Sequence, residues 1–158
     1  MADVTLRPAA SDSPESERLL AAYEAELVPL GVTLNHGWAG GVTPAQLAPP
    51  QGAWLVAWRG REAVACGGVR PLSPGVCEIK RMYVDPSARG EGLARRLLSE
   101  LENAAAALGA EVARLDTGRD MGPAIGLYRA TGYVEIADYN GNPDAGWWFE
   151  KRLYSTSA

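Results

Sequence analysis

Three apolar segments joined by very short turns constrain the fold of this chain more than any other feature. Residues 53–58, 63–69 and 76–84 have the composition of strands, and residues 59–62 and 73–75 between them are typical of turns. Turns this short cannot return the chain to the far end of a neighbouring strand, so consecutive strands must run antiparallel. The sequence therefore predicts an antiparallel meander at the centre of the chain.

The segment after the meander predicts a helix and then another strand. Apolar residues recur there at helical spacing: Leu93, Leu97, Leu101, Ala105 and Leu108. We expect this helix to begin near Gly90 and to end at Gly109. A strand over residues 112–115 should follow it, and residues 116–118 should lead the chain out of that strand. Strand, helix and strand in this order form a right-handed crossover, which makes the two strands parallel.

The remaining segments complete the fold prediction. They indicate a strand over residues 4–7, a helix between its cap Ser13 and Gly31, a helical turn at Thr43-Pro44, a helix capped by Asp120, and strands over residues 133–139 and 147–153. This order predicts the α+β class, an α/β sandwich with a mixed, mostly antiparallel seven-stranded sheet flanked by helices. We expect residues 1–154 to form a single domain and residues 155–158 to be a frayed tail.

Composition excludes several classes of function. The 158 residues are 47% hydrophobic and 22% charged, as in soluble globular proteins. The formal net charge of −4 argues against a nucleic-acid partner, which would require a basic surface. No apolar run reaches the roughly 18 residues of a membrane helix, and residues 1–10 lack a signal-peptide pattern. We therefore expect no membrane partner and a cytoplasmic location.

Cysteine and histidine are too few for a disulfide framework or a typical metal site. The chain has two cysteines, Cys66 and Cys77, and one histidine, His36. Both cysteines fall within predicted strands, so we expect them to be buried and reduced. We expect no metal ion to be involved in the function.

The segment with the strongest chemical signal follows the third strand of the meander. It consists of Arg89, Gly90, Glu91, Gly92, Leu93, Ala94 and Arg95. Glycines allow close approach of a ligand to the backbone, and the first turn of a helix presents unpaired N–H groups to an anion. The two arginines add donors that suit phosphate oxygens. The alternative is a glycine-rich helix start beside solvated arginines. A P-loop and a dinucleotide-binding fingerprint are both absent from the sequence.

Several motifs together resemble the GCN5-related N-acetyltransferase (GNAT) superfamily. The family pattern Arg/Gln-x-x-Gly-x-Gly/Ala matches residues 89–94, and residues 80–86, 115–118 and 124–133 resemble the family's neighbouring elements. The resemblance implies a fold whose fourth and fifth strands splay apart, and acetyl-CoA as cosubstrate. It also implies that the strand segment Met82, Tyr83 and Val84 pairs with pantetheine, while residues 89–95 hold the pyrophosphate. Met121 stands where the family often has an asparagine that contacts the cofactor.

The resemblance also implies catalytic residues. Tyr128 matches a tyrosine that serves as general acid for the departing thiolate, and a phenol can donate a proton at neutral pH. The alternative for Tyr128 is a core aromatic residue. Glu78 is the candidate base, acting directly or through water, and the alternative is an ion pair with Lys80 or Arg81. His36 or water could serve as base instead.

The expected function is acetyl-CoA-dependent N-acetylation. The acetyl group would move to a primary amine of a small molecule by direct attack in a ternary complex, because no cysteine has an evident histidine partner. Acetylation of a protein or peptide, and a non-catalytic acyl-CoA-binding module, remain as alternatives. Trp38 could line the acceptor site, and an exposed Trp147 or Trp148 would suit a homodimer interface.

Overall fold

A seven-stranded mixed sheet organises the molecule, in a computed structural model that describes residues 3–32 and 41–153. The strands are β1 (Val4–Pro8), β2 (Ala53–Arg59), β3 (Glu62–Ser73), β4 (Val76–Val84), β5 (Val112–Gly118), β6 (Val134–Ile136) and β7 (Ala145–Arg152). Their order in the sheet is β1-β2-β3-β4-β5-β7-β6. The β4–β5 pair is parallel and the other neighbours are antiparallel. The predicted class, meander and crossover are confirmed.

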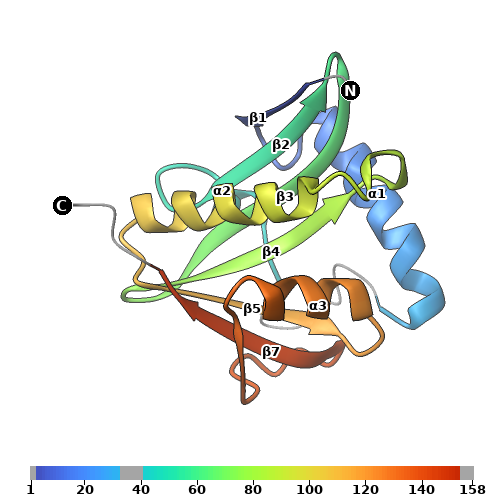
Figure 1. Cartoon of the computed structure of the whole chain (residues 1–158). Helices are drawn as coiled ribbons and strands as arrows, with labels where there is room; N and C mark the ends of the chain where they lie inside the picture. The colour runs from blue at the N-terminus through green and yellow to red at the C-terminus, as the bar shows by residue number, and fades with distance from the viewer. Residues whose placement is uncertain (1–2, 33–40, 154–158) are drawn as a thin grey trace.

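Helices cover both faces of this sheet. They are α1 (Pro14–Leu27), α2 (Leu93–Ala107) and α3 (Gly122–Ala130), with short 3-10 helices η1 (Val28–Leu30), η2 (Pro44–Leu47) and η3 (Pro86–Ala88). Ser13 caps α1 as predicted, because its hydroxyl accepts a hydrogen bond from the Ser16 N–H at 3.2 Å. In Figure 1, α2 and α3 lie in front of the sheet and α1 lies at its right-hand side.

Alternating residues of the central strands pack in two different hydrophobic clusters. Ala65 of β3 packs in the cluster that contains Leu97 and Leu101 of α2. Its neighbour Cys66 packs in the cluster that contains Leu19 of α1 and Leu47 of η2. Successive strand residues point to opposite faces, so the two clusters lie on opposite sides of the sheet. Cys66 and the second cysteine, Cys77, are buried and free, as predicted.

The neighbouring strands β4 and β5 pair over only part of their length. Their register joins Val76, Cys77 and Glu78 to Val112, Ala113 and Arg114. Beyond these residues β4 remains paired with β3, and β5 remains paired with β7. The two strands thus part in the middle of the sheet, which confirms the expected splay and opens a space at their carboxyl ends.

The structure corrects several predicted boundaries. Residues 116–118 continue β5, because they pair with β7. The helix α2 begins at Leu93 and not near Gly90, because Gly90 and Gly92 have φ values of 81° and 79°. Asp120 does not cap α3; Met121 occupies that position without a side-chain bond. The strand expected over residues 133–139 is reduced to β6. Among the described residues, no helix is long and apolar enough to cross a membrane.

Candidate active site

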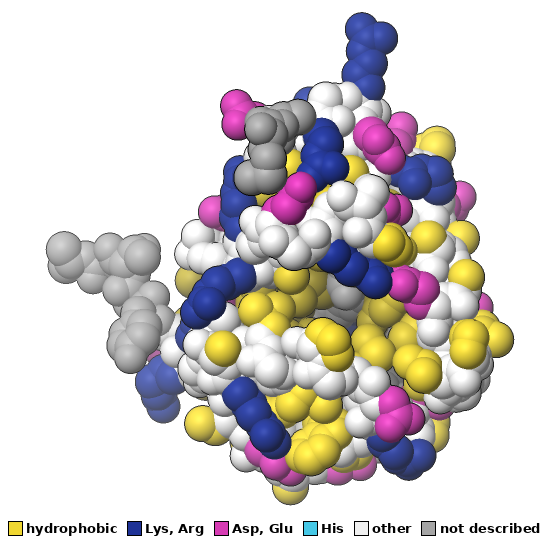
Figure 2. All heavy atoms as spheres, turned by 45° about the vertical axis from the view of Figure 1, so that its right-hand side comes forward, with side chains coloured by type: hydrophobic (Ala, Val, Ile, Leu, Met, Phe, Trp, Pro, Cys, Tyr) yellow, Lys and Arg dark blue, Asp and Glu magenta, His cyan; other side chains and the backbone are white. Residues whose placement is uncertain are grey.

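A large cavity occupies the space where β4 and β5 part. Its volume is about 760 Å³, which lies in the range of small-molecule sites. The walls come from α1, β4, the start of α2, the end of β5 and α3. Figure 2 shows the hollow with hydrophobic side chains inside it and basic side chains near its rim. The cavity therefore joins the predicted anion site to the predicted catalytic elements.

Residues 89–95, which we call the glycine cradle, form one end of the cavity. A Cβ atom built on Gly90 or Gly92 would meet nothing within 4 Å, so both glycines border open space. The first hydrogen bond of α2 runs from the Arg96 N–H to the Gly92 carbonyl at 3.1 Å. The N–H groups just before Arg96 therefore lie at the positive end of the helix dipole. The open space and the helix start together suit an anionic group.

The arginines of the cradle are already engaged with protein groups. Arg89 donates to the Val84 carbonyl at 2.9 Å and to both Glu26 oxygens at 2.9 and 2.8 Å. Arg95 donates to the Ala130 carbonyl at 3.4 Å. Both arginines line the cavity, as do Gly90, Gly92, Leu93 and Ala94. Glu91 is not among the described lining residues, and its carboxylate forms an ion pair with Arg59.

The strand β4 presents an open edge to the cavity after Glu78, where β5 turns away. Met82, Tyr83 and Val84 lie on this part of β4 and line the cavity. A strand edge without a partner strand offers N–H and C=O groups that can pair with an extended ligand containing amides. The Tyr83 ring stacks on Tyr23 of α1 with centroids 5.1 Å apart. Burial and the Glu26 carboxylate raise the pKa of Tyr83 to about 12.

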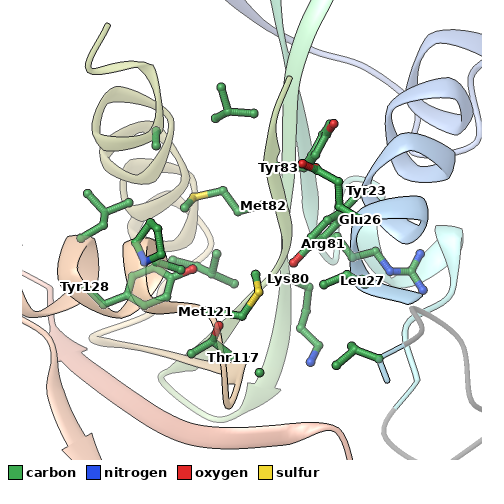
Figure 3. Close-up of a pocket in the computed structure, with 18 of the residues that line it drawn as sticks. Tyr23, Glu26, Leu27, Lys80, Arg81, Met82, Tyr83, Thr117, Met121 and Tyr128 are labelled. Atoms are coloured by element: carbon green, nitrogen blue, oxygen red, sulfur yellow. The ribbon is translucent and has the colours of Figure 1, made fainter. Parts of the chain in front are cut away.

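Tyr128 packs in the core and also lines the cavity. Its ring lies 5.7 Å from that of Tyr133 and 5.9 Å from that of Phe149, centroid to centroid. Figure 3 shows Tyr128 directed from α3 into the space between the strands. Burial raises the pKa of the phenol above its usual value, so it stays protonated at neutral pH. Met121 lines the same region.

Glu78 lies in the sheet, fully buried, and is not among the described residues that line the cavity. Arg70 Nε donates to Glu78 Oε1 at 2.9 Å, and the Tyr139 hydroxyl and Asn140 Nδ2 donate to Oε2 at 2.6 and 3.2 Å. Lys80 Nζ lies 3.7 Å from Oε1. The structure thus places Glu78 in an ion-paired cluster. Burial and the nearby Glu78 charge raise the pKa of Tyr139.

Sequence reasoning missed the polar residues that connect Glu78 to the cavity. Asp116 of β5 lines the cavity and lies 3.3 Å from Lys80 Nζ. Asn140 and Asn142 both donate to Asp116 Oδ2, at 2.6 and 3.2 Å. The Asn-Gly-Asn-Pro segment predicts only a turn, and nothing local to it indicates that the turn folds over β4 and β5.

Four candidate residues from the sequence remain, together with the question of a metal ion. His36 and Trp38 lie outside the described residues. Trp147 and Trp148 are both half-buried, and their indole N–H groups donate to the Arg119 carbonyl at 3.3 Å and to Asn140 Oδ1 at 2.9 Å. Within residues 3–32 and 41–153, no three His, Cys, Asp or Glu side chains gather in a group that could hold a metal ion.

The fold and the cavity together define a class of protein. A sheet that parts beside a glycine-rich helix start suits an extended, amide-containing ligand that ends in phosphates. The family model described as "Acetyltransferase (GNAT) family" matches residues 14–133. The chain belongs to this family, and the resemblance noted in the sequence is confirmed.

Curated relatives carry acetyltransferase names. The chain is 40% identical over 90 residues to the "IAA acetyltransferase" of Azospirillum brasilense, a match that covers 56% of this chain and 59% of that protein. It therefore spans less than two thirds of the length of that relative. It is 31% identical over 139 residues to the uncharacterized N-acetyltransferase YjgM of Escherichia coli K12, over 81% of this chain and 79% of that protein.

Solved structures share the fold. A Klebsiella pneumoniae protein assigned as an acyl-CoA N-acyltransferase superposes with a TM-score of 0.79 and 31% identity, covering 98% of this chain and 100% of that chain. The yncA protein of Salmonella typhimurium, solved with acetyl-CoA, gives a TM-score of 0.70 at 19% identity, over 98% of this chain and 96% of that chain. The second likeness shows the fold alone.

Proposed function

We propose that this chain is an acetyl-CoA-dependent N-acetyltransferase that acts on a primary amine of a small molecule. The observation that carries the proposal is one continuous cavity that runs from the glycine cradle, along the open edge of β4, to the Tyr128 phenol. Membership of the GNAT family and the acetyltransferase names of its relatives support the same reaction class.

The residues of the cavity fit acetyl-CoA. The glycine cradle has open space at Gly90 and Gly92 and a helix start behind them, which suits a pyrophosphate. Arg89 and Arg95 supply positive charge beside it. The backbone of Met82, Tyr83 and Val84 can pair with the amides of pantetheine, because β5 has left this edge of β4. These residues would hold the thioester between β4 and β5.

The acetyl group can move directly from CoA to the amine, without an acyl-enzyme intermediate. The neutral amine nitrogen attacks the thioester carbonyl carbon, the C–N bond forms, the C–S bond breaks, and CoA leaves as a thiolate. Tyr128 donates its proton or a hydrogen bond to that sulfur, and the nitrogen loses its extra proton to water. The two described cysteines are poor nucleophiles, because burial raises the pKa of Cys66 to about 12 and also raises that of Cys77.

Water is the favoured proton acceptor in this proposal. Glu78 accepts hydrogen bonds from Arg70, Tyr139 and Asn140, is fully buried, and is not among the described residues that line the cavity. We assign Glu78 a positioning role, in which it anchors Asn140 and Lys80 beside Asp116. The ion-pair alternative from the sequence therefore fits its position better than direct action as a base.

The test is release of free thiol from acetyl-CoA with a panel of small amines. Tyr128→Phe keeps the ring packing and removes the acid, so kcat should fall by about a hundredfold, as for loss of a general acid, with CoA affinity unchanged. Tyr133→Phe is the matched control, because its hydroxyl donates to Glu102 at 2.8 Å and it does not line the cavity. CoA binding without turnover of any amine would favour the non-catalytic module, and turnover of peptides alone would favour a protein acetyltransferase.

A further inference from the structure

Met121 stands at a position that favours a polar residue. It is the N-cap of α3, and no side-chain hydrogen bond caps this helix. Serine, threonine, aspartate and asparagine stabilise an N-cap, because their side chains accept a hydrogen bond from the first turn. The methionine side chain lines the cavity instead. A residue that is unfavourable for the helix and places an apolar group in the site points to a role in binding.

The end of β5 makes room for Met121. Gly118 is the last residue of β5, and a Cβ built on it would lie 3.2 Å from Met121 Cγ and 3.7 Å from Val32 Cγ2. A larger residue at this position would therefore press on Met121. Figure 3 shows the Met121 side chain directed into the space between Tyr128 of α3 and Leu27 of α1. Met121 thus faces the same space as the phenol that is proposed to donate to the leaving thiolate.

Apolar side chains from α1 and the segment after it face the same part of the cavity. Leu27 is buried at the end of α1, whereas Leu30 of η1 is 44% exposed. Both line the cavity, as Val32 does. Leu30, Val32 and Met121 also line a smaller adjoining cavity of about 80 Å³, which no described residue of the glycine cradle lines. Leu27, Leu30, Val32 and Met121, which we call the apolar end, therefore lie away from the cradle.

The charged side chains near the apolar end are bound within the protein or exposed to water. Asp116 lies 3.3 Å from Lys80 Nζ, and Arg81 donates to a backbone carbonyl at 3.2 Å. Three other charged residues line the smaller cavity: Arg119, Asp120 and Asp144. The first two are exposed, and the third interacts with other protein groups. The buried part of a ligand at this end therefore contacts mainly apolar surface.

We propose that the acceptor is a primary amine with an apolar alkyl or aryl group, and that Met121, Leu27 and Leu30 bind that group. This inference rests on the proposed acetyl transfer and names the substrate class for the same site. The apolar group packs at the apolar end, and the amine points along the cavity toward the thioester beside Tyr128. Methionine is flexible and polarisable, so it can adapt to alkyl and aryl groups alike.

The test compares alkylamines with amino alcohols of the same length, in which a hydroxyl group replaces the terminal methyl group. For wild type, kcat/KM should rise about fourfold with each methylene of the alkylamine, as burial of apolar surface predicts. It should also favour each alkylamine over its amino alcohol by about tenfold or more, because a buried hydroxyl group without a partner is unfavourable.

Two exposed residues of η1 provide a matched pair of variants. Leu30→Ser should reduce the preference for alkylamines through a higher KM, with the affinity for acetyl-CoA unchanged. Val28→Ser is the control, because Val28 is 57% exposed in the same short helix and is not among the described residues that line either cavity. Val28→Ser should therefore keep the full preference.

Substitutions at Met121 separate apolar contact from packing. Met121→Leu keeps an apolar side chain and should keep the preference. Met121→Gln keeps the length of the side chain and adds a polar group, so it should lose most of the preference. The ratio of alkylamine to amino alcohol turnover is the readout, because a general loss of folded protein would lower both rates and leave their ratio unchanged.

The outcomes separate this inference from the function on which it rests. Equal use of alkylamines and amino alcohols by wild type, or acetylation confined to amines with polar or charged groups, would overturn the inference and leave acetyl transfer in place. An unchanged preference in both Leu30→Ser and Met121→Gln would also overturn it. A protein that binds no CoA species, or that binds CoA and acetylates no small amine, would overturn the proposed function and this inference with it.

Discussion

Gly92 illustrates how a single residue links backbone conformation to ligand binding. It has a φ of 79° and is the N-cap of α2, and its missing Cβ leaves the cradle open. Gly92→Glu should abolish acetyl-CoA binding, because it places a negative charge where the phosphates are expected to lie. The left-handed backbone adds a stability cost of about 1–2 kcal/mol. Calorimetric titration and urea unfolding measure the two effects separately.

Gly75 provides the matched control for this change. It lies in the β3–β4 turn with a φ of 75°, and a Cβ there would also meet nothing within 4 Å. Gly75→Glu should therefore lose a similar amount of stability and keep its affinity for acetyl-CoA. Unchanged affinity in Gly92→Glu would contradict the assignment of the cradle.

Neither the face of the sheet on which Glu78 lies nor its partners could be predicted from the residues next to it in the sequence. Strand alternation would place Glu78, Lys80 and Met82 on one face unless a bulge intervenes. The register shift and the positive φ of Arg81 break that alternation, and neither has a local sequence signal, because arginine is unusual in this conformation. Glu78 is enclosed by Arg70 and Asn140, which come from other parts of the chain. Its partners depend on tertiary structure.

At the scale of elements, β3 needs small residues because both of its faces are covered. A Cβ on Gly68 would lie 2.6 Å from the Trp54 ring and 2.7 Å from Leu47 Cδ2. Gly68→Ala should therefore destabilise the protein by about 1–3 kcal/mol, as overpacked cores do. The midpoint of urea unfolding measures this loss.

The opposite effect is expected in α3. Gly126 is an exposed residue within this helix, and a Cβ there would meet nothing within 4 Å. Gly126→Ala should raise stability by up to about 1 kcal/mol, the difference in helix propensity. A Gly68→Ala variant as stable as the wild type would contradict the packing described for β3, and destabilisation by Gly126→Ala would contradict the open space beside α3.

Element types were predictable, and several element ends were not. Apolar spacing was enough for α2, and short turns were enough for the meander. The extension of β5 over residues 116–118 depends on pairing with β7, a contact distant in sequence. The same holds for β6, a short strand at the edge of the sheet that pairs with β7. Long-range pairing decides these ends, and local propensity does not.

At the scale of the whole molecule, buried tyrosines and a buried thiol should make the fold sensitive to alkali. Burial raises the pKa of Tyr23 to about 12 from 10.0, and that of Cys66 to about 12 from 9.0. A raised folded-state pKa gives stability that is complete below the unfolded value and is lost as pH rises through the folded value. Stability should therefore fall between about pH 9 and pH 12.

Circular dichroism and tyrosinate absorbance, recorded along the same pH titration, measure this loss. We expect these tyrosines to ionise together with unfolding. Full ionisation of all tyrosines near pH 10, with native circular dichroism, would contradict the described burial.

The measurement that tests the account most directly is calorimetric titration of the purified protein with acetyl-CoA, free CoA and ATP. The cavity joins a phosphate cradle to an open strand edge, so affinity should require both the phosphates and the pantetheine arm. We predict saturable binding of acetyl-CoA and CoA, and no binding of ATP. Failure of both CoA species to bind would contradict the proposed function.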